Sequence, residues 1–346
     1  MKLFSHDLGV DLGTANVLIY VDGRGIVVRE PSVVAVDKNT GKILQVGAAA
    51  RNMLGRTPGN VVAMHPLKDG VISDHEMTVQ MLQEFFRKAA KRSSLLNPKP
   101  RVVISVPSGV TEVEERTVIN AAIEAGARRV YLIEEPLAAA LGANLDIRSP
   151  NGQMIVNIGC GTTDIAVLTL NGVATSSSIK VAGSAFDEAI MRYVRRKHSV
   201  IIGQATAEDI KIHVGCVFPR SENVSRTFKG RDAKTGVPRE ITILSSDIYP
   251  ELMRPARQIM DEVLSVLEET SPELVSDISE NGITLTGGGS QLWGMDKLLM
   301  ERTGVVCTIA DDADSCVAYG CGKSLAWINH MTEGPINIAR KRIMRG

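Results

Sequence analysis

The sequence lacks the features that mark secreted, zinc-bound, membrane-spanning and nucleic-acid-binding proteins. Its five cysteines form no CxxC pair and have no metal-ligand spacing, so we expect reduced thiols that lie mostly in the core. The 39 basic and 39 acidic residues cancel, which excludes a global basic field for nucleic acid. No apolar run approaches the roughly 18 residues of a transmembrane helix. The opening MKLFSHDLGVDLG is not a signal peptide, so we expect a cytoplasmic protein.

The 346 residues are enough for about two domains. Both halves open with the same pattern: a strand, an acid or amide, a Gly-Thr turn and a second strand. In the first half this is Asp11-Leu12-Gly13-Thr14, and in the second it is Asn157-Ile158-Gly159-Cys160-Gly161-Thr162. Strands and helices then alternate, which implies parallel crossovers and an α/β class. We expect two duplicated lobes at 1–150 and 151–330, followed by a basic tail at 331–346.

Three local patterns give further predictions. Short apolar strands crowd the first 47 residues and predict one antiparallel meander. The polar stretch 221–243 predicts an exposed hairpin. Pro255 is expected to kink or break a helix at 247–268.

Two hairpin tips are rich in residues that leave backbone N–H groups open to an anion. They are formed by Gly13, Thr14, Ala15 and Asn16, and by Gly159, Cys160, Gly161, Thr162 and Thr163. Neither tip leads directly into a helix, so neither is a Walker A loop or a dinucleotide fingerprint. Facing each other, they would clamp a polyphosphate, and Asp11 would hold a hydrated Mg²⁺. Taken alone, each tip is equally compatible with an ordinary hairpin turn.

A third glycine loop, LTGGGSQLWGMDKLL, lies between a strand and a helix. Its Gly287, Gly288 and Gly289 would let the backbone lie flat against a ligand ring or ribose. A plain strand-to-helix turn is the alternative for this loop alone. The three loops together favour a nucleotide site.

The segments LGVDLGTANVLIY, IVNIGCGTTDIAVL, IEEPLAAALGA and LTGGGSQLWGMDKLL resemble the phosphate 1, phosphate 2, first connecting and adenosine motifs of the actin, sugar-kinase and chaperone ATPase superfamily. Within it, the sequence resembles the MreB/Mbl family of bacterial actin homologues over nearly its whole length. The resemblance implies an actin-like ATPase fold, with two lobes that are each split into two subdomains. It also implies ATP and Mg²⁺ in the cleft between the lobes.

The resemblance assigns roles to individual residues. Asp11 would lie near the metal, and Glu135, favoured over Glu134, would orient the attacking water with Thr162 as its partner. Glu208 and Lys211, one helical turn apart, would contact ribose and adenine. The remaining nucleotide-binding residues implied are Gly13, Thr14, Ala15, Asn16, Asn157, Gly159, Gly161, Thr162, Thr163, Gly287, Gly288 and Gly289.

Two positions depart from the family pattern, which usually has Asp at position 157 and Gly at position 160. Asn157 keeps the shape of Asp but loses a negative charge and gains a donor. Cys160 would occupy a backbone position of positive φ, and its sulfur would crowd the phosphates. We therefore expect nucleotide binding with slow conversion of ATP to ADP and phosphate.

Family resemblance also implies filaments of this chain, on its own or with paralogues, at the inner face of the cytoplasmic membrane. Leu95 and Leu96 fall in the family's apolar membrane loop, flanked by Lys91, Arg92 and Lys99. Packing of both leucines back onto the lobe is the alternative. Leu3 and Phe4 form a second apolar patch, and the basic tail adds Arg340, Lys341, Arg342 and Arg345, unless these form only a solvated charge run. The implied partners are the machinery of cell elongation and cell-wall synthesis.

Other functions of the same superfamily remain open. A divergent paralogue would act mainly by co-polymerisation. A small-molecule kinase would need a sugar site, and no such constellation is found in the sequence. A chaperone ATPase would need a linker and a peptide-binding domain after the second lobe.

Overall fold

The computed structural model describes residues 7–90, 99–330 and 336–337. The apolar and basic segments proposed for the membrane fall outside these residues: Leu3, Phe4, Lys91, Arg92, Leu95, Leu96, Arg340, Lys341, Arg342 and Arg345. Within the described part of the chain, no helix has both the length and the apolar composition needed to cross a bilayer.

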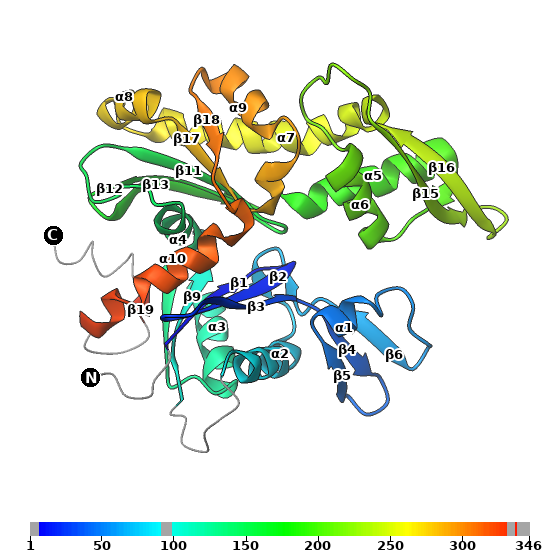
Figure 1. Ribbon diagram of the computed structural model, residues 1–346, viewed down its shortest axis with the longest axis horizontal. Coiled ribbons are helices and arrows are strands. Elements are labelled where there is room, and N and C mark those ends of the chain that lie inside the picture. The colour runs from blue at the N-terminus through cyan, green and yellow to red at the C-terminus, as the bar shows by residue number, and fades with distance from the viewer. Residues whose placement is uncertain (1–6, 91–98, 331–335, 338–346) are drawn as a thin grey trace.

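Two larger sheets form the centre of the molecule (Figure 1). The first has the order β19-β10-β9-β1-β2-β3 and is built from β1 (Leu8–Leu12), β2 (Asn16–Val21), β3 (Gly25–Pro31), β9 (Arg101–Val106), β10 (Arg129–Glu134) and β19 (Ile336–Asn337). The second has the order β13-β12-β11-β17-β18 and is built from β11 (Gln153–Ile158), β12 (Thr163–Thr169), β13 (Gly172–Ile179), β17 (Ile283–Thr286) and β18 (Cys307–Ile309).

The two sheets have the same internal plan. In each, the first strand pairs antiparallel with the next strand along the chain, β1 with β2 and β11 with β12. On its other side it pairs parallel with a strand from a later crossover, β1 with β9 and β11 with β17. The α/β duplication expected from the sequence is therefore present. We call the first sheet with its covering elements lobe I, and the second sheet with its covering elements lobe II.

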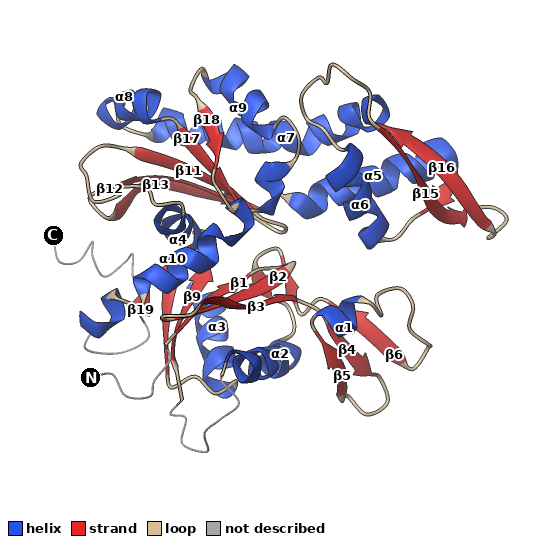
Figure 2. Cartoon of the chain, viewed as in Figure 1, coloured by secondary structure: helices blue, strands red, loops and turns tan. Residues whose placement is uncertain are grey.

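Each lobe carries a smaller sheet on the same side of the molecule (Figure 2). In lobe I this sheet has the order β5-β4-β6 and contains β4 (Val34–Asp37), β5 (Ile43–Val46) and β6 (Val61–Met64), followed by the short hairpin β7 (Leu67–Lys68) and β8 (Val71–Ile72). In lobe II it consists of β14 (Val200–Ile201), β15 (Ser225–Asp232) and β16 (Pro238–Leu244). The expected exposed hairpin is β15–β16. The predicted single meander was wrong beyond β3, because β4 pairs with β5 and β6 and not with β3.

Helices cover both lobes. Lobe I contains α1 (Ala48–Arg51), α2 (His75–Ala89), α3 (Glu112–Glu124) and α4 (Glu135–Gly142). The second half of the chain contributes α5 (Gly183–His198), α6 (Gln204–Val214), α7 (Ser245–Glu269), α8 (Pro272–Asn281), α9 (Met295–Thr303) and α10 (Cys316–Ser324), with 3₁₀ turns η1 (Gly288–Gln291), η2 (Ala313–Ser315) and η3 (Trp327–His330). Helix α7 continues through Pro250 and Pro255, so the expected break at Pro255 does not occur. Its buried face, which includes Leu252, Ile259 and Val263, packs on lobe II and outweighs the lost backbone bonds.

Helices α4 and α10 cross between the two sheets (Figure 1). The core around them draws Val103 and Tyr131 from lobe I together with Ile155 and Ala166 from lobe II. The crossing is close because both helices carry glycine at the contact. A Cβ on Gly142 would overlap the carbonyl oxygen of Cys316, and one on Gly320 would overlap that of Ala138. The same helix α10 lies on β1, where a Cβ on Gly9 would lie 2.6 Å from the backbone nitrogen of Gly322.

We predict that Gly320→Ala destabilises the protein by about 3 kcal/mol or more, because backbone on both sides of the crossing must move apart to admit one methyl group. Chemical denaturation measures this loss. Gly59→Ala is the matched control, since nothing lies within 4 Å of a Cβ at that position. Equal stability of the two variants would contradict the close crossing.

Candidate functional site

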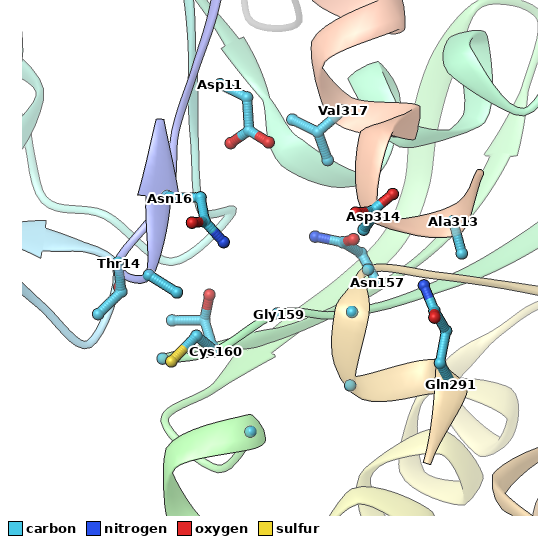
Figure 3. A pocket seen from close by; sticks show the side chains of 18 of the residues that line it. Asp11, Thr14, Asn16, Asn157, Gly159, Cys160, Gln291, Ala313, Asp314 and Val317 are labelled. Carbon is cyan, nitrogen blue, oxygen red and sulfur yellow. The ribbon is translucent and has the colours of Figure 1, made fainter. Parts of the chain in front are cut away.

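A cavity of about 510 Å³ lies between the lobes (Figure 3). Its volume falls in the range of roughly 300–1,000 Å³ that is typical of small-molecule sites. Nearly every residue proposed from the sequence lines it: Asp11, Gly13, Thr14, Ala15, Asn16, Glu135, Asn157, Gly159, Gly161, Thr162, Glu208, Lys211, Gly287, Gly288 and Gly289. Residues separated by more than 270 positions in the chain therefore meet around one space.

The two hairpin tips touch each other at one end of this cavity. The backbone N–H of Gly70 donates to Thr14 Oγ1 at 3.0 Å. A Cβ on Gly161 would lie 2.7 Å from Thr14 Oγ1 and 3.1 Å from the Gly70 nitrogen. Only glycine at position 161 therefore lets the second tip approach the first without a shift. The contact brings backbone of the glycine-rich tips from both lobes to one end of the cavity, which is the kind of backbone that suits an extended anion.

The third glycine loop packs behind the second tip. Gly287 has a φ of 80°, a conformation that glycine adopts without strain. A Cβ on Gly289 would lie 2.9 Å from the carbonyl oxygen of Ile158 and 3.1 Å from that of Gly159. A Cβ on Gly288 would meet nothing within 4 Å. Gly287 and Gly289 thus serve the packing, while Gly288 presents open backbone to the cavity.

Asp11 places a carboxyl group in the cavity from the end of β1. Burial raises its pKa to about 7, and Asp314 adds to this effect, while Arg29 opposes it. A carboxylate of this kind is stabilised by a cation. No cluster of three or more His, Cys, Asp or Glu able to hold a metal occurs in the part of the chain that the structure describes. A single carboxylate that faces the cavity suits a hydrated Mg²⁺, a cation that prefers carboxylate and water oxygens, and Asp11 is the residue that would hold it.

Glu135 and Asn157 form a buried polar pair at the wall of the cavity. Asn157 Nδ2 donates to Glu135 Oε2 at 3.1 Å, and Thr286 Oγ1 donates to Asn157 Oδ1 at 3.2 Å. Burial raises the pKa of Glu135 well above its usual value, and the neighbouring charges of Asp164 and Asp11 act in the same direction. Both polar atoms of the Asn157 amide are therefore hydrogen-bonded: the nitrogen donates to the Glu135 carboxyl group, and the oxygen accepts from the Thr286 hydroxyl.

Glu208 and Lys211 lie on one face of α6, as the sequence predicts, but each has a protein partner. Lys211 Nζ is 2.8 Å from Asp187 Oδ1 and also donates to the Gly183 carbonyl oxygen at 3.1 Å. Glu208 Oε2 is 2.7 Å from Nη2 of Arg51, the last residue of α1 in lobe I. The second pair crosses the mouth of the cleft and joins the lobes on the side opposite to α4 and α10.

Two expectations about the second tip need correction. Thr163 is fully buried outside the cavity lining, and its hydroxyl donates to the Val181 carbonyl oxygen at 2.7 Å. Alternation along β12 turns it away from the side where Thr162 lies. Cys160 is not among the non-glycine residues of positive φ in the described chain, so the expected strain was wrong. Its thiol does line the cavity, and burial raises its pKa to about 11, which keeps it neutral.

Two further charged residues, which sequence reasoning missed, lie at the cavity. Arg29 Nη1, on β3, is 2.6 Å from Asp314 Oδ2, which lies 285 residues later in η2. Both residues line the cavity beside Asp11. A long-range pair of this kind has no local sequence pattern that would identify it.

Comparison with known proteins identifies the family. The family model described as MreB/Mbl protein matches residues 5–333. The chain is 50% identical over 329 residues to the cell shape-determining protein Mbl of Bacillus cereus, an alignment that covers 95% of this chain and 98% of Mbl. The chain belongs to the MreB/Mbl family. It is also 49% identical over 331 residues to the cell shape-determining protein MreB of Escherichia coli K12, with 94% of this chain and 95% of MreB covered.

A solved structure confirms the actin-like fold expected for the family. MreB5 of Spiroplasma citri bound to AMPPNP matches this chain with a TM-score of 0.88 at 39% identity. The match covers 94% of this chain and 97% of MreB5.

We predict that Asp11→Asn stabilises the nucleotide-free protein at about pH 8 by roughly 1 kcal/mol, because it removes an uncompensated charge. The pKa of Asp11 is 3.8 in the unfolded chain and about 7 in the folded chain. The folded wild-type protein therefore loses stability as the pH rises from 3.8 to about 7, whereas Asp11→Asn does not. The gain should therefore shrink at about pH 5.5. Thermal unfolding at both pH values measures it, with the exposed Asp22→Asn as control. A gain that does not change with pH would contradict the assignment.

We predict that Arg51→Ala speeds nucleotide release by about two- to fivefold, since the variant loses a half-exposed ion pair worth at most about 1 kcal/mol. Stopped-flow chase of a fluorescent ATP analogue measures the rate. The exposed Arg56→Ala removes the same charge from the same region and should leave the rate unchanged. Identical rates in both variants would show that the Arg51–Glu208 pair does not hold the cleft.

Proposed function

We propose that this chain binds ATP with Mg²⁺ and assembles into membrane-associated filaments that organise cell-wall synthesis and maintain rod shape. The observation that carries the proposal is the single cavity built from three glycine loops of both lobes. A ligand that bridges the lobes alters their relative position, and so the surfaces that a filament would use. Relatives named cell shape-determining proteins support the biological role.

The residues of the cavity supply a consistent set of roles. Backbone N–H groups of residues 13–16 and 159–162 would bind the phosphates from two sides. Asp11 would accept hydrogen bonds from metal-bound water. Glu208 and Lys211 would contact the ribose and adenine, with the open backbone at Gly288 against the nucleoside. Bound Mg²⁺ would neutralise the terminal phosphate.

Hydrolysis would depend on Glu135 and Thr162 orienting the attacking water. Asn157 bears on this step, because its amide nitrogen already donates to Glu135 Oε2. That contact would leave Oε2 a poorer acceptor for water. Without a negative charge at position 157, the metal-bound waters would also lose a charged hydrogen-bond acceptor. We therefore propose an ATPase with slow turnover. Co-polymerisation with a paralogue of faster turnover is the second form of the same function.

The membrane part of the proposal rests on the sequence resemblance. Lys99 is the one basic flanking residue of that loop in the described chain, and it is exposed. An exposed cation suits an anionic lipid surface. The proposed location is the cytoplasm, at the inner face of the membrane.

Sedimentation with anionic liposomes, with and without ATP·Mg²⁺, tests the proposal while phosphate release is recorded. We expect the protein to pellet with ATP and liposomes and to release little phosphate. Gly161→Val, which fills the contact between the two tips, should stay in the supernatant under the same conditions. A wild-type chain that binds ATP and remains soluble, alone and with liposomes, would contradict filament formation by the chain alone.

Asn157→Asp serves as the internal comparison in that experiment. It removes the donor to Glu135 and adds the charge expected at the metal shell, so phosphate release should rise by about tenfold. An unchanged rate would show that Asn157 does not limit turnover.

A further inference from the structure

Asp164 is a buried carboxylate beside the site whose charge raises the pKa of Glu135, and it has no other role in the proposed function. Asp164 on β12 is fully buried and lies directly opposite Asn157 in the register of β11 and β12. Its Oδ2 makes no hydrogen bond to the described residues. Burial raises the pKa of Asp164, and the Ser108 N–H is the largest opposing influence. Burying an apolar side chain at this position would cost less folding free energy than burying a carboxylate, so packing alone does not account for Asp164.

Asp164 contacts the other lobe through its second oxygen. The backbone N–H of Ser108, in the loop after β9 of lobe I, donates to Asp164 Oδ1 at 3.0 Å. The Ser108 hydroxyl donates to Glu134 Oε2 at 3.3 Å. One loop residue of lobe I therefore holds both Asp164 of lobe II and the last residue of β10.

These contacts close a ring around the water-orienting group. Glu134 precedes Glu135, which begins α4, and Glu135 Oε2 accepts from Asn157 of lobe II. Asn157 is in turn the strand partner of Asp164. The ring crosses between the lobes twice, once at Ser108–Asp164 and once at Glu135–Asn157. A rotation that opens the cleft would stretch both of these contacts together. In the closed cleft, each contact limits movement of the residues that form the other.

We propose that Asp164 is a positioning residue that couples closure of the two lobes to the orientation of Glu135. The inference rests on the proposed ATPase function. In the closed cleft the Ser108–Asp164 bond holds β12, and through its pairing with β11 it holds Asn157 against Glu135. In the open cleft Glu135 loses its fixed partner, so the water-orienting group is set only after both lobes have closed on the nucleotide. Asp164 itself does not line the cavity.

Three variants separate the effect of the Ser108–Asp164 hydrogen bond from the effect of the Asp164 charge. Asp164→Asn keeps an oxygen for the Ser108 N–H and removes the charge. Asp164→Val removes both but retains strand preference. Ser108→Ala keeps the N–H and removes only the bond to Glu134. We expect single-turnover phosphate release to fall about tenfold in Asp164→Val, about threefold in Ser108→Ala and less than twofold in Asp164→Asn. ATP affinity should stay within about threefold of wild type throughout, because neither substituted residue, Asp164 nor Ser108, lines the cavity.

A second readout does not need turnover. Small-angle X-ray scattering of the monomer should show compaction on AMPPNP binding in wild type and Asp164→Asn, and reduced compaction in Asp164→Val. Equal compaction and equal release in Asp164→Val and wild type would overturn the inference. A fall in phosphate release in Asp164→Asn as large as in Asp164→Val would also overturn it, because the charge of Asp164 and not its hydrogen bond to Ser108 would then be responsible. A wild-type chain that fails to bind ATP would refute the proposed function itself, and the affinity measurement reports that separately.

Discussion

The crossing of α4 and α10 is the constraint on which the rest of the structure depends. Gly142 and Gly320 allow the two helices to approach backbone to backbone, and Gly9 lets α10 lie on β1. Because α4 follows β10 of lobe I and α10 follows β18 of lobe II, this contact fixes one sheet against the other. The ends of β1 and β11 then face each other, and the glycine tips that follow them meet. A packing requirement between two helices thus determines where the loops of the cavity meet.

The cavity combines buried acids with cations that are already paired. Asp11, Glu135 and Asp164 all have pKa values raised chiefly by burial. Arg29 and Lys211 meanwhile pair with Asp314 and Asp187. A polyphosphate entering such a site would depend on backbone N–H groups and on the metal it brings, more than on free basic side chains. This balance would let a chain with no net charge offer an anion site, and it is the reason we expect the missing charge at position 157 to slow turnover.

Local patterns predicted the site well where the information lies in a few neighbouring residues. The repeated strand–Gly–Thr pattern located both glycine tips that line the cavity, because a turn at a strand end is encoded by the residues that form it. Pairing beyond β3 was not predictable, since β4 has the same apolar alternation whichever strand it joins. Helix α7 does not break at Pro255, because burial of one face of the helix outweighs a local helix breaker. The Arg51–Glu208 and Ser108–Asp164 contacts join residues far apart in the chain, and only the assembled lobes bring them together.

Hydrogen exchange of the whole chain, with and without ATP·Mg²⁺, tests most directly whether both lobes clamp one nucleotide. The account predicts slower amide exchange at residues 13–16, 159–162 and 287–289 together, because one ligand would cover backbone N–H groups from all three loops. Slowing confined to the loop of a single lobe, or absent from all three, would contradict a nucleotide site shared between the lobes.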